Sequence, residues 1–209
     1  MIDARVFFKK IGRARFISHL DMTRAMTRAF SRAGLDVWYT EGFNPHMYLT
    51  FALPLSLGQQ TICDYFDVRF NRLDDEKKSA EALNACLPEG LEIISIGGRE
   101  YKTIDICAAE YEILLKGKDL GERWREFLSE DIIEVEKKSK RGMQKFDVKP
   151  HIKILSLDEN CGELKLLIEL PTGNKLNVNP ALILDAFAKA AGVKIESSKI
   201  CRMKICYNS

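Results

Sequence analysis

The first hundred residues carry strand and helix patterns in the order β-α-β-β-α-β, which limits the fold more than any other feature. Alternating apolar residues predict strands, and apolar residues three or four positions apart predict helices. The expected elements cover residues 4–10, 18–33, 36–40 with a continuation at 49–53, 61–70, 76–86 and 91–96. We also expect residues 13–17 to continue the first strand beyond Gly12. This element order defines the split βαβ, or ferredoxin-like, unit.

A similar series follows the polar segment 97–105, where we place a domain boundary. The expected strands cover residues 107–115, 132–137, 151–157, 163–170 and 199–207, and the expected helices cover 120–128 and 180–191. One strand is surplus to a second split βαβ unit. The predicted fold class is therefore α+β, with two tandem ferredoxin-like domains at 1–98 and 106–209, the second with an extra strand or hairpin.

The composition points to a cytoplasmic protein that does not enter a membrane. The longest apolar runs are shorter than the ~18 residues of a membrane span, and residues 1–5 lack the apolar core of a secretory signal. The net charge is +2, so attraction for nucleic acid must come from local basic patches. The 6 cysteines include no C-x-x-C pair, which predicts reduced thiols and no metal or other cofactor held by this chain.

Two of the 3 histidines lie beside strong structural signals in the first domain. Ser18 suits the N-cap of a helix that begins at His19, and Asp21 completes a variant capping box. His46 follows a turn at Asn44-Pro45. A strand–helix–strand crossover makes the second strand parallel to the first, so both histidines should reach one edge of the sheet. We therefore predict one concave site formed by Ser18, His19, Asp21, Glu41, Asn44 and His46.

Three roles are open for this site. The two histidines, with an ordinary pKa of about 6.5, could exchange protons in general acid–base catalysis. They could hold a metal with Asp21, although no third close ligand is evident. The residues could also brace the local structure or contact a ligand without chemistry. We expect contact without chemistry and no metal, and His19 and His46 are the catalytic candidates if a reaction occurs.

Two basic stretches could contact phosphate groups. The first predicted helix places Arg24, Arg28 and Arg32 in one stripe, which is either a solvated flank or a phosphate-binding ridge. Residues 137–149 are expected to form a basic loop, which could bind phosphates or stay solvated. The phosphate-binding candidates in this loop are Lys140, Arg141, Lys145 and Lys149.

The sheet of the first domain offers a possible RNA-binding face. In a ferredoxin-like sheet the first and third strands are central neighbours, and one face carries no helix. Phe7 and Tyr65 alternate with core residues on these two strands, so both rings should lie on that open face. RNA-recognition sheets stack bases on aromatic residues placed in this way. The alternative is that the second domain covers this face and buries both rings.

Several motifs resemble those of a known family. They are Phe16-Ile17-Ser18-His19-Leu20-Asp21, Arg32-Ala33-Gly34-Leu35, Glu41-Gly42-Phe43-Asn44-Pro45-His46, Pro54-Leu55 with Gly58, and Asp64-Tyr65-Phe66-Asp67. They are similar to the bacterial radical-SAM-linked proteins of unknown function, which are often fused to or encoded beside a B12-binding-type radical SAM enzyme. The resemblance supplies no catalytic residues. It implies a radical SAM protein as partner, and that partner would carry the iron–sulfur cluster.

We therefore predict a non-catalytic accessory module that binds RNA or another phosphate-rich ligand and works with a radical SAM enzyme. One alternative is a metal-independent RNA endonuclease that uses His19 and His46 as acid and base. Another is a structural subunit that binds only protein.

Overall fold

The computed structural model describes residues 1–139, 142–173 and 176–208. The chain divides into two compact units, Met1–Thr103 and Ile104–Ser209. The described residues form an α+β protein with four α-helices, so the predicted class is confirmed. Within this part of the chain, no helix combines the length and apolar character needed to cross a membrane.

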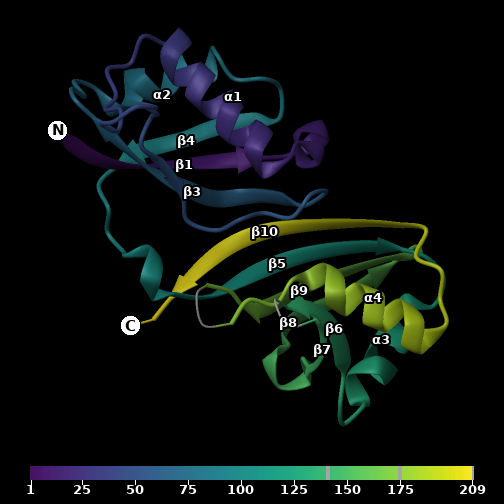
Figure 1. The fold of residues 1–209 in the computed structure, drawn as a ribbon. Coiled ribbons are helices and arrows are strands. Elements are labelled where there is room, and N and C mark those ends of the chain that lie inside the picture. The colour runs from purple at the N-terminus through teal and green to yellow at the C-terminus, as the bar shows by residue number, and fades with distance from the viewer. Residues whose placement is uncertain (140–141, 174–175, 209) are drawn as a thin grey trace. The chain divides into compact units, whose positions relative to one another are not determined.

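In the first unit, helices α1 and α2 lie on one face of a four-stranded sheet (Figure 1). The elements are β1 (Ile2–Lys10), α1 (His19–Arg32), β2 (Leu49–Phe51), β3 (Gln60–Phe70), α2 (Glu76–Asn84) and β4 (Leu91–Gly97). The strand order is β4-β1-β3-β2, and each neighbouring pair is antiparallel. The expected helix over residues 18–33 is confirmed, because Ser18 caps its start and Gly34 follows its end with a positive φ.

The core of the first unit forms where the apolar stripe of α1 meets alternating residues of β1 and β3. Val6 and Phe8 are buried on β1, and Phe66 lies opposite Val6 on β3. From α1, Met26 and Phe30 are fully buried, and the Phe30 ring lies 6.1 Å from the Phe66 ring. The helical spacing and the strand alternation therefore bury their apolar sides against one another.

Two sequence predictions in this unit are wrong in detail. Residues 13–17 do not continue β1, because Gly12 has a φ of +59° and turns the chain into the 3₁₀ helix η1 (Gly12–Phe16). Residues 36–40 form only isolated bridges, Val37 with Phe70 and Tyr39 with Met47. The strand that pairs in register with β3 is β2.

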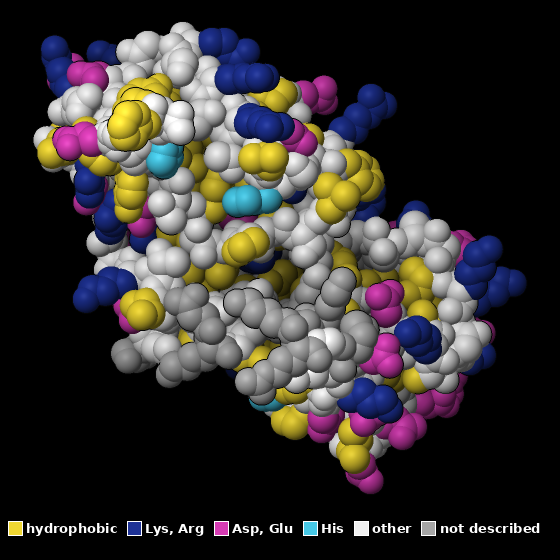
Figure 2. Space-filling model, in the orientation of Figure 1, with side chains coloured by type: hydrophobic (Ala, Val, Ile, Leu, Met, Phe, Trp, Pro, Cys, Tyr) yellow, Lys and Arg dark blue, Asp and Glu magenta, His cyan; other side chains and the backbone are white. Residues whose placement is uncertain are grey.

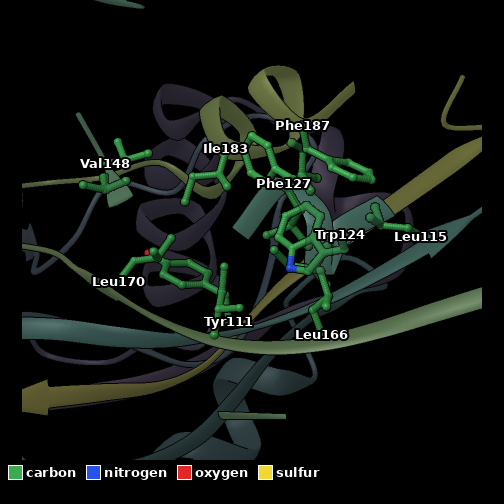
Figure 3. Packing of buried hydrophobic residues seen from close by; sticks show 14 of the residues in the cluster. Tyr111, Leu115, Trp124, Phe127, Val148, Leu166, Leu170, Ile183 and Phe187 are labelled. Carbon is green, nitrogen blue, oxygen red and sulfur yellow. The ribbon is translucent and has the colours of Figure 1, made fainter. Parts of the chain in front are cut away.

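The second unit repeats the same order of strands. Its elements are β5 (Ile106–Lys116), α3 (Leu120–Ser129), β6 (Glu134–Ser139), β7 (Gly142–Asp147), β8 (Lys153–Asn160), β9 (Glu163–Pro171), α4 (Pro180–Ala191) and β10 (Ser197–Tyr207). The main sheet has the order β10-β5-β9-β8, and β6 with β7 forms a separate hairpin. Trp124 of α3 is fully buried in its core, and its ring lies 4.6 Å from that of Phe187 on α4 (Figure 3).

The described residues of the basic segment 137–149 lie largely in strands, which corrects the prediction of a loop. Residues 142–147 form β7, which pairs with β6. Lys145 forms a 2.8 Å ion pair with Glu134 across this hairpin, and Glu134 raises the pKa of Lys145 through that contact. Opposite charges on facing strands favour pairing over a solvated loop.

The face of β1 and β3 opposite to the helices carries charged cross-strand pairs. Asp3 lies opposite Arg69, Arg5 opposite Asp67, and Phe7 opposite Tyr65. Arg5 is 2% exposed and forms a 2.9 Å ion pair with Asp67. Its guanidinium also donates a 2.8 Å hydrogen bond to the Tyr101 carbonyl and lies 3.8 Å from the centroid of the Tyr65 ring.

This arrangement corrects the expected base-stacking surface. Tyr65 is 1% exposed, the Arg5 guanidinium lies over its ring, and the Phe7 ring packs against it at 5.6 Å. The Tyr65 hydroxyl lies 3.5 Å from the Thr103 hydroxyl. Tyr65 is therefore too buried to stack on a base, whereas Phe7 is half-buried and its stacking role stays a prediction.

We expect the Asp67→Asn substitution to destabilise the protein by about 3–5 kcal/mol, because it leaves the buried Arg5 without its carboxylate partner. The matched control is Glu92→Gln, which removes the exposed Lys9–Glu92 pair on neighbouring strands and should cost less than about 1 kcal/mol. Urea unfolding followed by circular dichroism measures both. Equal small losses in the two variants would contradict a structural role for the Arg5 pair.

Candidate functional site

The first turn of α1 is fixed by a cap within the Ser18–Asp21 motif. The Ser18 hydroxyl accepts a 3.1 Å hydrogen bond from the Asp21 backbone N–H and donates a 2.7 Å bond to the Asp21 carboxylate. Arg24 donates to the other carboxylate oxygen at 3.3 Å. These bonds, first that from Ser18, lower the pKa of Asp21 below its ordinary value of 3.8. The predicted Ser18 cap is therefore confirmed, and Asp21 is held as a carboxylate at the positive end of the helix.

A buried lysine supports this turn from beneath. Lys10, at the end of β1, is 1% exposed, and its ammonium donates a 3.3 Å hydrogen bond to the carbonyl of Ile17, the residue before the cap. Burial lowers the pKa of Lys10, and the negative charge of the buried Asp64 opposes that shift. The ammonium and the carboxylate thus offset part of the cost of burying each other.

A second connection ties the same turn to the loop before β3. The backbone N–H of Gly58 donates a 2.8 Å hydrogen bond to the carbonyl of Arg15 in η1. Parts of the chain that are far apart in sequence therefore meet under the start of α1. They are the end of β1, the Pro54–Gly58 segment and the start of β3.

Sequence reasoning missed Lys10 and Asp64, although a signal was present. Lys10 continues the alternation of Val6 and Phe8, and Asp64 shares the core-facing register of Phe66 on β3. A charged residue at a position where the alternation requires an apolar one indicates a buried ion pair or a functional group.

The structure gives the two histidines separate local partners. His19 is exposed, and its ring packs edge-on against Phe51 of β2 at 4.9 Å. His46 Nδ1 lies 3.0 Å from the Thr40 hydroxyl and 3.3 Å from the Asn44 carbonyl. Within residues 1–139, 142–173 and 176–208, no contact joins the two rings. A single site shared by both histidines therefore stays a prediction.

The segment around His46 is a closed turn. The Thr40 N–H donates a 2.8 Å hydrogen bond to the His46 carbonyl, and the His46 N–H donates a 3.1 Å bond to the Thr40 hydroxyl. Glu41 and Asn44 are both exposed within this turn. Its side chains can contact a ligand, while its backbone shape is set by Thr40.

The arginine stripe of α1 is exposed, but its members differ in what they contact. Arg24 pairs with Asp21, and Arg32 donates a hydrogen bond to the Cys86 carbonyl after α2. Arg28 is exposed between them, on the side of α1 away from the core. Of the three arginines, Arg28 is therefore the most accessible to a ligand, and Arg32 is the least accessible.

Two lysines of the basic segment 137–149 already have partners within the second unit. Lys145 pairs with Glu134, and the Lys149 ammonium donates a hydrogen bond to the Leu128 carbonyl. Lys140 and Arg141 lie outside the described residues. We therefore place the candidate site in the first unit.

A cleft and an acidic cluster lie away from the Ser18–Asp21 and Thr40–His46 segments. A cleft of about 500 Å³ lies between the end of α1 and the start of α2, where Arg72 pairs with Asp74 and Asp75 caps α2. In the second unit, ligand atoms of Glu110, Glu169 and Cys206 lie within 4.8 Å of one another.

Lysines already neutralise that acidic cluster. Lys204 pairs with Glu110 at 3.0 Å, and Lys153 pairs with Glu169 at 3.2 Å. Burial and the charge of Glu169 raise the pKa of the Cys206 thiol, which disfavours the thiolate that binds metals. We assign no metal site to these residues.

The fold and the site define an α+β protein with a capped, braced helix start that leaves polar motif residues exposed. A family model described as "Uncharacterized protein conserved in bacteria (DUF2344)" matches residues 4–180. Because the match spans most of the sequence, this chain belongs to that bacterial family. No curated protein matches the sequence.

Solved structures supply a similar fold. A chain from a structure titled "Crystal Structure of a Cbf5-Nop10-Gar1 Complex" is 10% identical, with a TM-score of 0.51. The match covers 97% of this chain and 48% of that chain, so this chain spans about half the length of its structural relative. A structure titled "Crystal Structure of an Unknown Protein from Galdieria sulphuraria" is 12% identical, covers 99% of this chain and 98% of its own, and has a TM-score of 0.27. That score does not indicate a shared fold.

The Ser18→Ala substitution should destabilise the protein by about 1 kcal/mol, because it removes the side-chain acceptor for the Asp21 N–H. Ser31→Ala is the matched control, since Ser31 lies in the last turn of the same helix and donates only to the Thr27 carbonyl. Its effect should stay within about 0.5 kcal/mol. Urea unfolding compares the two, and equal effects would argue against the cap.

The Asp21 carboxyl should titrate with a midpoint below 3.8 in the native protein and closer to 3.8 in Ser18→Ala. Because its pKa is lower in the folded state, ionised Asp21 stabilises the protein above pH 3.8, and this contribution is lost as the pH falls through the folded-state pKa. NMR of the carboxyl carbon measures the midpoint. An unchanged midpoint in Ser18→Ala would show that Ser18 is not the cause.

Proposed function

We propose that this chain is a non-catalytic binding module that holds RNA or another phosphate-rich ligand for a radical SAM enzyme in the bacterial cytoplasm. The observation that carries the proposal is the outward side of α1. His19, Arg24 and Arg28 are exposed there, while the opposite side of the helix is buried. Arginine suits phosphate recognition because its planar fork can donate two hydrogen bonds at once.

The start of α1 is held rigidly, which suits the binding of a ligand. Lys10 and Gly58 hold the backbone before the helix, and the Ser18 cap fixes its first turn. Side chains on a rigid element lose less conformational freedom when they bind a ligand. His19 can therefore present its ring at a fixed place beside the arginines, and Glu41, Asn44 and His46 can do so from the turn held by Thr40.

We also propose that each unit is a ferredoxin-like domain. Counted along each unit without the β6–β7 hairpin, both sheets have the order fourth, first, third, second strand. The hairpin is then an insertion in the second domain. A likeness to a chain from a Cbf5–Nop10–Gar1 complex supports only the fold, although that chain is part of an assembly.

The radical SAM partner is proposed from the motif resemblance. The sequence has no C-x-x-x-C-x-x-C run, so the partner would hold the iron–sulfur cluster that such enzymes use. This chain would then contribute ligand binding, and the chemistry would take place on the partner.

A metal-independent RNA endonuclease using His19 and His46 is the catalytic alternative. Such cleavage needs a base within hydrogen-bond reach of the ribose 2′-hydroxyl. Each histidine has its own local contacts, so no observation favours a shared reaction centre. A subunit that binds only protein is the third possibility, and RNA binding, RNA cleavage and partner capture distinguish the three.

The native protein should bind single-stranded RNA with an affinity that falls between about 50 and 200 mM salt. Arg28→Glu should weaken binding and reduce the slope of log affinity against log salt by about 1. Arg125→Glu is the matched control, because it makes the same charge change on the exposed side of α3. Fluorescence anisotropy with labelled RNA provides both numbers.

The other outcomes separate the alternatives. No RNA binding, together with capture of a radical SAM protein by the tagged native chain, would reject the RNA proposal in favour of a structural subunit. RNA cleavage that is lost in His19→Ala or His46→Ala would reject the non-catalytic proposal. Equal effects of Arg28→Glu and Arg125→Glu would move the binding surface away from α1.

A further inference from the structure

The 3₁₀ helix before α1 presents an aromatic ring with one face covered by an arginine. Phe16 is 58% exposed, although it lies in the central motif of the first unit. The guanidinium carbon of Arg15 lies over its ring, 4.6 Å from the centroid. A cation at this distance is attracted electrostatically to the face of the ring, and this attraction holds the ring in place. The exposed remainder of the ring is open to a flat partner.

Other exposed apolar side chains belong to the same end of the unit. Leu20, in the first turn of α1, is 58% exposed, and Leu57 is 66% exposed. Leu57 precedes Gly58, whose N–H donates to the Arg15 carbonyl. Single exposed apolar residues are common on proteins. Several exposed apolar side chains on segments that a backbone hydrogen bond joins indicate a contact surface.

Arg15 has hydrogen-bonding capacity that the fold does not use. Within the described part of the chain, its Nε atom is buried without an acceptor. A buried donor without a partner costs free energy, so it calls for an explanation. Because Nε itself is buried but Arg15 as a whole is only half-buried, it is the rest of the guanidinium that can donate to an anionic group of a ligand that also covers the ring.

We propose that Arg15 and Phe16 hold one unpaired nucleotide of RNA, an inference that rests on the proposed RNA-binding function. The base stacks on the open face of Phe16, and the Arg15 guanidinium donates to the adjoining phosphate. Stacking of a base on an aromatic ring with an arginine nearby is the usual chemistry of single-stranded nucleic-acid binding. The stacking position is then at the start of α1 and not on the sheet, where Arg5 covers Tyr65.

The charges around the ring favour a nucleotide over an apolar protein segment. Arg13 is exposed in the same 3₁₀ helix, and the N-terminal end of α1 follows directly. The charge of Arg13 favours a negatively charged ligand. Phe43 is also fully exposed, but Glu41 shares its turn, and in the described part of the chain no arginine lies over its ring. We therefore do not propose Phe43 as a stacking site.

The test compares a short single-stranded RNA with an abasic RNA of the same length. Phe16→Ala should weaken binding of the normal RNA roughly 5- to 150-fold, the loss expected for one stacked base. Phe16→Leu should lose most of this affinity, and Phe16→Trp should retain it. Binding of the abasic RNA should be weaker and should not respond to Phe16→Ala. Fluorescence anisotropy measures all four proteins.

Arg15→Met tests the phosphate contact separately. It should weaken binding of both the normal and the abasic RNA and reduce the salt slope by about 1. The control for Phe16→Ala is Ile132→Ala in the second unit, which likewise removes an apolar side chain that is 64% exposed. Thermal unfolding of each variant checks that the fold is intact.

Three results would overturn the inference. If Phe16→Ala binds the normal RNA as tightly as the native protein while Arg28→Glu is weakened, the proposed function survives and the stacking site is rejected. If Phe16→Ala keeps RNA binding but no longer captures a protein partner, the ring is a protein contact. If the native protein binds neither RNA, the proposed function and this inference both fail.

Discussion

Antiparallel pairing of β1 with β3, in the register that sets Val6 opposite Phe66, is the constraint on which the rest of the first unit depends. Because side chains alternate between the faces of a strand, this one register decides both faces of the sheet. On one face, the apolar residues of both strands form the core under α1. On the other face, the same register brings Arg5 opposite Asp67. A shift of one residue would exchange these faces and bury the charges in the core.

The same register creates the polar support beneath the candidate site. Lys10 follows the inward alternation at the end of β1, where Asp64 of β3 also points to the core side. An ammonium in this position is costly unless it finds acceptors, and it finds the Ile17 carbonyl and the charge of Asp64. That requirement fixes the chain where the Ser18 motif begins. The polar core residues therefore position the site without belonging to its surface.

The placement of Arg5 has a consequence for ligand recognition. An aromatic residue on each central strand is typical of an RNA-binding sheet, but Arg5 lies over Tyr65 and pairs with Asp67 at the same time. The exposed polar and aromatic residues of the family motifs lie instead at η1, at the first turn of α1 and in the turn that ends at His46. Figure 2 shows histidine, basic and apolar side chains at the surface of the first unit. The proposed recognition surface is thus built on helix starts and turns, which a rigid sheet supports.

The sequence by itself determined the elements and the local caps, because these depend on neighbouring residues. Alternation and helical spacing placed α1, β3 and α4 within one or two residues, and Ser18 and Gly34 marked the ends of α1. Only the tertiary structure decided what covers each side chain. Tyr65 contacts Arg5 across two strands, Arg32 donates to the Cys86 carbonyl, and β7 pairs with β6. These contacts join residues distant in the chain, and their free energies cannot be read from local patterns, since each depends on register and on competing partners.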